Sequence, residues 1–177
     1  VSAGSVTGLV AADTVCQARA QAAGLSGTFK AWMSDSQDDA YCRMHGLKGK
    51  KAANCGQATL PASAGPWVRT DGEPFAEVIS KLTGSATVLT PARFDENGVE
   101  TTVSWFYTGT DETGESISAR VCSDWTSTGA ASVAGTTVQI FNLWSEAIST
   151  DCQNPYPILC MQTGSGRPLT YQTTGKK

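Results

Sequence analysis

The fold is decided by ADTVCQARAQAAGLSGTFKAWMS, residues 12–34. From Thr14 to Ala23 the residues are good helix formers, and Asp13 in front of them is a suitable N-cap. Gly24 stands where a left-handed C-cap belongs. From Thr28 the apolar period changes from about 3.6 residues to 2, which is typical of a strand. The stretch therefore predicts a helix, a tight stop and a core strand.

The composition is typical of one loop-rich extracellular domain. Only 16% of the 177 residues are charged, and the net charge is −3. A general nucleic-acid binder needs a basic face to displace counterions, so the charge argues against that class. No apolar run approaches the ~20 residues that a membrane span needs. We expect one domain over residues 1–163 and a flexible tail or linker over residues 164–177.

The six cysteines are widely spread and include no CxxC pair. This arrangement favours three disulfides over a zinc cluster or a redox motif, with free or metal-bound thiols as the alternative. Disulfides indicate an oxidising compartment, so we expect a secreted protein in the extracellular space or at the cell surface. The pattern leaves the pairing open, because many pairings are compatible with these six residues: Cys16, Cys42, Cys55, Cys122, Cys152 and Cys160.

The rest of the chain predicts a second helix among short strands. The helix is expected over residues 71–85, with Pro74 in its first turn, Gly84 at its end, and a core-facing stripe of Phe75, Val78, Ile79 and Leu82. Strands are expected at residues 67–69, 102–108, 117–122, 138–144 and 156–161, a strand end and turn at 1–11, a hairpin turn at Asn97-Gly98, and loops at 42–55 and 127–137. This mixture predicts an α+β fold.

Three stretches, taken together, resemble the endostatin-like pattern. They are residues 16–29, the aromatic segment from Trp105 to Trp125, and Cys152-x7-Cys160 with its apolar strand. Endostatin is the C-terminal domain of collagens XV and XVIII, and a bacterial secreted family shares its C-type lectin-like fold. The resemblance implies that fold, with two helices and a twisted, mostly antiparallel sheet. It also implies the disulfides Cys16–Cys160 and Cys122–Cys152, which leaves Cys42 with Cys55.

The resemblance does not extend to the known ligands of these folds. Endostatin binds zinc through N-terminal histidines and an aspartate, whereas this chain has His45 alone. The Arg-rich heparin-binding face is missing, and so are the Glu-Pro-Asn, Gln-Pro-Asp and Trp-Asn-Asp motifs with which true C-type lectins bind sugars through calcium. The resemblance therefore predicts the fold and leaves the ligand open.

No group of residues has a catalytic pattern. A catalytic triad would need His45, which lies in a loop rich in lysine and glycine, where we expect it to be solvated. There is no GxSxG motif. Adjacent acids in turns, Asp95 with Glu96 and Asp111 with Glu112, are expected to be solvated rather than an acid and a base. We expect a protein that is not an enzyme.

The acidic loop is the candidate metal site. Asp35, Asp38 and Asp39 offer the hard oxygen ligands that calcium prefers, although their spacing matches no EF-hand. The alternative is a plain acidic surface loop. Calcium is therefore the one candidate cofactor, and no other cofactor is expected.

The basic loop and two tryptophans are the candidate ligand-binding residues. Lys48, Lys50 and Lys51 suit a sulfated or carboxylated glycan by charge, with a solvated loop as the alternative. Trp67 and Trp144 stand nearest to the predicted loops, so we expect them to offer a surface on which a sugar ring stacks.

Together these features predict a non-catalytic module for binding or adhesion at a bacterial surface. It would present loops from a disulfide-bonded scaffold to a glycan or protein ligand. The alternative is a structural subunit of a surface fibre or layer, which would self-associate through the ends of its chain. Neither hypothesis involves nucleic acid or a membrane span.

Overall fold

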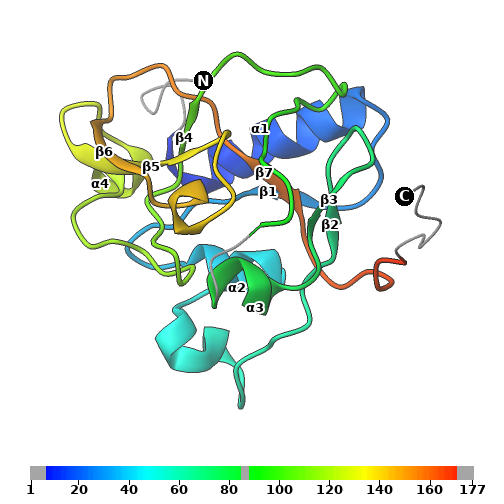
Figure 1. The fold of residues 1–177 in the computed structure, drawn as a ribbon. Helices are drawn as coiled ribbons and strands as arrows, with labels where there is room; N and C mark the ends of the chain where they lie inside the picture. Colours follow the sequence, from blue (N-terminus) through cyan, green and yellow to red (C-terminus); the bar gives the residue numbers. More distant parts are fainter. Residues whose placement is uncertain (1–6, 85–87, 171–177) are drawn as a thin grey trace.

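The computed structural model describes residues 7–84 and 88–170, and it is a mixed α+β fold with small antiparallel sheets (Figure 1). The sheets pair β1 with β7, β2 with β3, and β4 with β5 and β6 in that order. The elements are α1 (Gly8–Ala22), β1 (Phe29–Ala31), α2 (Ala40–Met44), η2 (Lys51–Gly56), β2 (Trp67–Val68), β3 (Pro74–Ala76), α3 (Ile79–Thr83), β4 (Trp105–Tyr107), α4 (Cys122–Trp125), β5 (Ala131–Thr136), η3 (Asn142–Trp144), β6 (Ile148–Asp151) and β7 (Cys160–Gln162).

Helix α1 is longer than the sequence predicted. It begins at Gly8, so the strand end and turn expected over residues 1–11 are wrong for 8–11, while residues 1–6 lie outside the described part of the chain. Asp13 is therefore inside the helix and is not its N-cap. The predicted stop is confirmed, because Leu25 N–H donates to the Ala20 carbonyl at 2.9 Å across Gly24, whose φ is +73°.

The three disulfides are Cys16–Cys160, Cys42–Cys55 and Cys122–Cys152, the pairs that the resemblance implied. The first joins α1 to the start of β7, which pairs with β1. Helix α1, the predicted core strand and the last strand are thereby fixed to one another.

The predicted second helix is mostly wrong. Residues 74–76 form strand β3, which pairs with β2, and only Ile79–Thr83 is helical. Phe75 lies in the strand with its ring edge-on to Trp144, at 5.6 Å between ring centroids. The predicted stripe is still in the core, since Phe75, Ile79 and Leu82 are buried. Burial was therefore predicted correctly, whereas the backbone follows the pairing with β2.

The longest strand, β5, lies where a loop was predicted, within residues 127–137. It is the central strand of its sheet, flanked by β4 and β6. Small residues permit this position: a Cβ on Gly135 would lie 2.2 Å from the Trp144 carbonyl oxygen. The strands expected at 138–144 and 117–122 are also wrong, since the first ends in η3 and the second provides one bridge, Val121 to Ser132.

Two turns of the described chain have consecutive residues other than glycine in left-handed backbone, apart from the single residue Ala119. Asn54 and Cys55 have φ of 52° and 56°, and in α4 all four residues, 122–125, have φ between 50° and 62°. Such backbone is unfavourable for L-residues by roughly 1–2 kcal/mol each. Each turn contains a disulfide cysteine, and in α4 the Trp125 indole N–H also donates to the Ser34 carbonyl at 2.8 Å. A disulfide therefore stabilises the left-handed backbone in both turns, and in α4 the Trp125 hydrogen bond adds to it.

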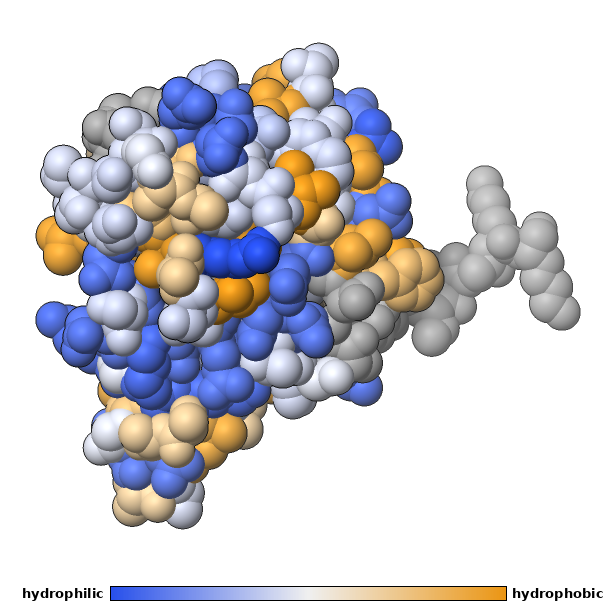
Figure 2. All heavy atoms as spheres, turned by 90° about the vertical axis from the view of Figure 1, so that its left-hand side faces the viewer, coloured by the Kyte–Doolittle hydropathy of each residue, from blue (hydrophilic) through white to orange (hydrophobic). Residues whose placement is uncertain are grey.

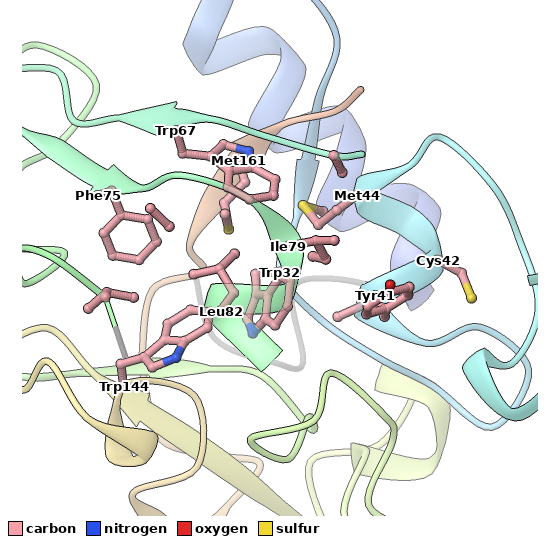
Figure 3. Close-up of a cluster of buried hydrophobic side chains, with 14 of the residues drawn as sticks. Trp32, Tyr41, Cys42, Met44, Trp67, Phe75, Ile79, Leu82, Trp144 and Met161 are labelled. Carbon is pink, nitrogen blue, oxygen red and sulfur yellow. The ribbon is translucent and has the colours of Figure 1, made fainter. Parts of the chain in front are cut away.

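The core has two clusters of buried side chains. The first gathers residues of α2, α3, β2 and β3 around Trp32 and Trp144 (Figure 3). The second lies under α1 and includes Tyr107 and Trp125. The chain stays paired beyond the boundary expected at residue 163, because Gly164 N–H donates to the Met44 carbonyl at 2.8 Å and Gly166 N–H to the Gly65 carbonyl at 2.7 Å.

Candidate functional site

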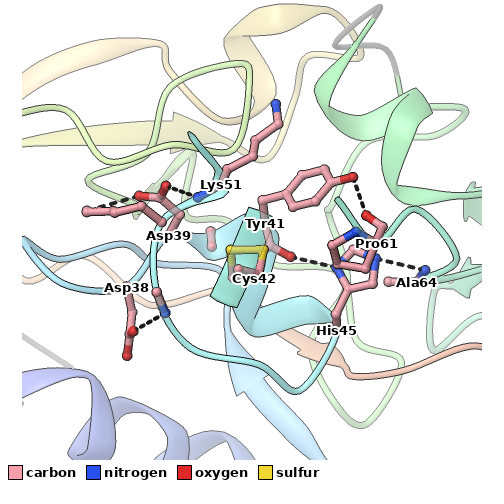
Figure 4. The surroundings of a disulfide bond; sticks show 12 residues. Asp38, Asp39, Tyr41, Cys42, His45, Lys51, Pro61 and Ala64 are labelled. Carbon is pink, nitrogen blue, oxygen red and sulfur yellow. Dashed lines mark hydrogen bonds and ion pairs between the residues drawn. A yellow bond between two sulfur atoms is a disulfide. The ribbon is translucent and has the colours of Figure 1, made fainter. Parts of the chain in front are cut away.

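The predicted acidic and basic loops are bonded to each other. The Asp39 carboxylate, only 2% exposed, accepts hydrogen bonds from Lys51 N–H at 2.8 Å and from Ser116 N–H at 2.9 Å (Figure 4). It also forms an ion pair with the Lys50 ammonium group at 3.1 Å. These bonds satisfy the buried carboxylate.

The other two candidate calcium ligands close the same loops. One Asp38 oxygen accepts from Gly49 N–H at 2.6 Å, and one Asp35 oxygen accepts from Asp38 N–H at 2.6 Å. Within residues 7–84 and 88–170, no group of three or more His, Cys, Asp or Glu side chains could hold a metal ion. The structure therefore does not support the calcium prediction, because these carboxylates bind backbone N–H groups instead of converging.

Two of the three lysines predicted to bind a ligand also bond to the scaffold. The Lys50 ammonium group donates to Ser116 Oγ at 2.7 Å. The Lys51 ammonium group donates to the Thr113 carbonyl at 2.7 Å and lies 4.9 Å from the centre of the Tyr41 ring. Lys48 is exposed.

The two tryptophans expected to stack on a sugar are core residues. Trp144 is 1% exposed and packs on Trp32, with ring centroids 5.0 Å apart. Trp67 is 6% exposed, and its indole N–H donates to the Gln162 carbonyl at 2.7 Å. The prediction is wrong for both residues, because their ring faces are covered by other side chains (Figure 3).

His45 is not the solvated loop residue that the sequence suggested. It is half-buried, with Nδ1 3.0 Å from the Tyr41 carbonyl and Nε2 3.3 Å from Ala64 N–H (Figure 4). Both contacts are satisfied by a neutral ring that carries its proton on Nδ1. Burial lowers the pKa of His45, against a smaller opposite effect of the hydrogen bond to Tyr41. The ring therefore links α2 to the loop before β2.

A different group of residues forms a hollow of about 340 Å³. It lies beside β5 and β6, whose side of the molecule faces the viewer in Figure 2, where polar residues surround small separate apolar areas. Apolar side chains of both strands form part of its wall, and two carboxylates and a hydroxyl are its polar groups. Its lining residues are Glu112, Val133, Glu146, Ala147, Ile148 and Ser149.

A buried polar network beneath the hollow brings its two carboxylates together. Ser145 is fully buried, and its hydroxyl is 3.2 Å from both the Thr110 and the Asp111 carbonyl oxygens. The same hydroxyl accepts the Trp32 indole N–H at 2.9 Å. Since Glu146 follows Ser145 and Glu112 follows Asp111, this network places the two glutamates side by side.

The turn that carries Glu112 is held by its own side chains. One Asp111 oxygen accepts hydrogen bonds from Thr113 N–H at 2.8 Å and from Glu115 N–H at 2.9 Å. Asp111 N–H in turn donates to the Glu115 carbonyl at 2.9 Å. An aspartate that bonds backbone groups a few residues ahead builds a defined turn, so the position of Glu112 at the hollow is specified locally.

The electrostatics of the hollow are unusual in one respect. The pKa of Glu146 is raised to about 7 by burial, by the hydrogen bond to Glu112, and by the negative charges of Glu112 and Asp111. Arg120 lowers it, but this guanidinium also contacts Ser149 Oγ. At neutral pH the site therefore offers two hydrogen-bonded carboxyl groups, a hydroxyl and a nearby guanidinium.

The sequence did not predict this site. Asp111 and Glu112 were expected to be a solvated acidic turn, and Glu146 was not singled out. One signal was present: Glu146 is the only charged residue between Thr126 and Thr150. A lone carboxylate in a long uncharged stretch is a candidate for a specific partner, but its pairing with Glu112 depends on the tertiary fold.

No protein-family model matches the chain, and no curated protein is similar to it in sequence. No helix of the described residues is long and apolar enough to cross a membrane.

Proposed function

We propose that the chain is a non-catalytic extracellular binding module and that the hollow is its ligand site. The observation that supports this most is the convergence of Glu112, Glu146 and Ser149, with Arg120 beside them, on an open hollow with an aliphatic wall. Glu112 and Glu146 follow residues that the buried Ser145 network bonds together, and Ser149 lies in strand β6. Precise placement of a few polar groups is what a binding site needs.

The lining favours a polyhydroxylated ligand such as a glycan. Each sugar hydroxyl donates and accepts hydrogen bonds, and the hollow offers acceptors at Glu112 and Glu146 and, at Ser149, a hydroxyl that can do both. The Arg120 guanidinium lies next to this lining and donates to the Ser149 hydroxyl. The Val133 and Ile148 side chains supply an apolar surface for the C–H face of a sugar ring.

We also propose that the fold is C-type lectin-like, of the endostatin type. The support is the agreement of the three disulfide pairs with those that the resemblance implied. The same disulfides favour an oxidising, extracellular compartment. Non-reducing peptide mapping of the purified protein tests both proposals, and a different pairing or free thiols would remove their support.

A glycan array followed by calorimetry tests the ligand site. We expect the wild-type chain to bind a subset of glycans, and Glu112→Ala and Glu146→Ala to lose at least tenfold in affinity. Glu73→Gln is the matched control, because Glu73 is an exposed acid outside the hollow, so this variant should bind like the wild type. A wild-type chain that binds neither glycan nor extracellular protein would overturn the proposal.

The non-catalytic part needs its own test, because two carboxyl groups that share a proton can also activate water, as in aspartic proteases. Wild-type protein is incubated with panels of peptides, esters and glycosides, with Glu146→Gln in parallel. We expect no turnover above buffer for either protein. Hydrolysis by the wild type that Glu146→Gln abolishes would overturn this part of the proposal.

A second function, a structural subunit that self-associates, is favoured by one exposed segment. Val138, Phe141 and Leu143 are 47%, 59% and 41% exposed, which leaves three large apolar side chains in contact with water within one short segment. Sedimentation velocity of the wild type and of Phe141→Ser at increasing concentration tests this function. Assembly of the wild type that Phe141→Ser prevents would favour it over the binding module, and monomers throughout would remove it.

A further inference from the structure

The carboxylate pair in the hollow has no cation of its own. Neither Glu112 nor Glu146 forms an ion pair with any residue of 7–84 or 88–170. The charged groups that face Glu146 are Glu112 and Asp111 from the turn after β4, and Arg120 from the segment before α4. The walls contributed by β5 and β6 hold no titratable side chain at the hollow.

Two carboxylates in hydrogen-bond contact cannot both be ionised without strong repulsion. A shared proton removes this repulsion, since one carboxyl group then donates to the other. Burial, this contact and the neighbouring negative charges raise the pKa of Glu146 to about 7. The proton is therefore lost within the range of pH that an extracellular protein meets.

We propose that the Glu112–Glu146 contact is a proton-operated latch across the mouth of the hollow. With one proton shared, the latch holds the turn at residues 111–115 against the segment at 145–149. When the proton leaves to solvent, both carboxylates are charged, they repel each other, and the mouth widens.

The scaffold confines this movement to the mouth. Below the latch, the Ser145 hydroxyl stays bonded to the carbonyls of Thr110 and Asp111, and none of these groups titrates near neutral pH. Next to the latch, Ala147 N–H is bonded to the Ala134 carbonyl at 2.9 Å. The glutamate side chains and the tip of the turn are thus the parts free to separate.

The latch also determines which ligand the hollow prefers, and this step rests on the proposed function. The closed pair carries one negative charge and one O–H donor, which suits a neutral polyhydroxylated ligand. The open pair carries two negative charges and no donor. We therefore expect affinity for a neutral glycan to fall as the pH rises through 7.

NMR titration of the glutamate carboxyl carbons, without any ligand, tests the latch. In the wild type we expect Glu146 to titrate with a pKa near 7. In Glu112→Gln we expect Glu146 to titrate at least about one unit lower, because the like charge is removed. The control Glu73→Gln should leave the wild-type curve unchanged. Titration of Glu146 near 4.5 in the wild type, or no change in Glu112→Gln, would overturn the proposal.

The movement is read from the backbone amide signals of Thr113 and Gly114, at the tip of the turn. They should shift with the same midpoint in the wild type and stay constant between pH 5 and 9 in Glu146→Gln. Carboxyl titration without these shifts would show a shared proton but no latch. Since no ligand is present, a failed glycan array leaves this result intact, and a failed titration leaves glycan binding at fixed pH intact.

Discussion

Asp39 is a buried carboxylate and Glu146 a half-buried one, and the groups around them differ. Asp39 has an ammonium group and two backbone N–H groups bonded to its oxygens. Glu146 has another carboxyl group as its hydrogen-bond partner. Asp39 therefore faces opposite charge and backbone donors, whereas Glu146 faces like charge, which raises its pKa. The bonds of Asp39 join several elements of the scaffold, and the Glu146 contact is where we propose a response to pH.

This part of the scaffold is centred on α2, all five of whose residues are buried. The Arg43 guanidinium, 4% exposed, donates to Asp13 at 2.5 Å and to the Ala31 carbonyl at 3.3 Å, so it joins α2 to α1 and to β1. Asp39, next to the start of α2, joins it to the basic loop and to Ser116. The charged side chains of Arg43 and Asp39 therefore connect α2 to the elements around it.

The largest expected effect follows from breaking the Arg43 ion pair. Arg43→Met leaves Asp13 without its cation, and loss of one partner of a buried pair typically destabilises by about 3–5 kcal/mol. Denaturant unfolding measures it. If the variant does not fold, adding Asp13→Asn removes the uncompensated charge and keeps an acceptor for the Ala31 N–H. The double variant should recover part of the lost stability.

Arg19 provides the matched control. It pairs with Glu96 at the surface, where its side chain is 61% exposed. Arg19→Met should change the free energy of unfolding by less than about 1 kcal/mol. Equal losses in the two variants would contradict the view that compensated buried charges hold the α2 region together.

A smaller loss is expected from Asp39→Asn. The variant keeps the shape of the side chain but removes the charge that faces Lys50 and places an amide NH₂ where a carboxylate oxygen accepts hydrogen bonds. Charged hydrogen bonds are worth roughly 1.5–3 kcal/mol, so we expect a loss of about 2 kcal/mol in thermal or denaturant unfolding. Glu73→Gln, an exposed acid, should stay within about 0.5 kcal/mol of the wild type. Indistinguishable variants would mean that the Asp39 bonds contribute little.

The same contrast explains what the sequence could predict. The stop at Gly24, the strand at Phe29–Ala31 and the buried stripe of the 71–85 segment follow from local chemistry and from apolar periodicity, and these features are confirmed. The disulfide pairs followed from the resemblance. Signals carried by a few neighbouring residues were sufficient for the stop, the strand and the buried stripe.

The features that the sequence did not predict depend on contacts with residues far away in the chain. Residues 74–76 are a strand because β2 pairs with them, and Ala131–Thr136 is a central strand because its small residues fit between Phe106 and Trp144. The left-handed backbone of α4 depends on Cys152 and Ser34. The candidate site belongs to this class, since Ser145, remote in sequence, fixes Glu146 beside Glu112.

Ser145→Ala tests how the carboxyl pair is positioned, because Ser145 is a neutral residue that bonds the segments of both glutamates. Its loss leaves the buried Trp32 indole N–H without its acceptor, at a cost of about 1–2 kcal/mol in the free energy of unfolding. It also frees the 145–149 segment from the Thr110 and Asp111 carbonyls, so the carboxyl titration of Glu146 should move towards its ordinary range. Ser149→Ala, at the exposed edge of the hollow, should leave the Trp32 bond and the stability unchanged. A destabilised variant with an unchanged Glu146 titration would contradict the positioning role.

The smallest expected effect is the loss of stability at acid pH that protonation of His45 causes. The pKa of His45 is lowered in the folded protein, so the unfolded chain takes up a proton first as the pH falls. The contribution of neutral His45 to the free energy of unfolding is therefore complete above pH 6.5 and is lost as the pH falls below that value. Protonation removes the acceptor for Ala64 N–H, so the expected loss is that of one hydrogen bond, about 1 kcal/mol.

Unfolding free energies of the wild type and His45→Gln between pH 5 and 8 measure this effect. The variant is already less stable at pH 8, and its stability should change less between pH 7 and 5, because no ring is left to titrate. Glu146 has the opposite effect: its raised pKa makes the stability fall as the pH rises from 4.5 towards 7. If the stability of the wild type and of His45→Gln changed equally with pH, His45 would have the same pKa in the folded and the unfolded chain. The loss of stability in acid would then not arise from His45.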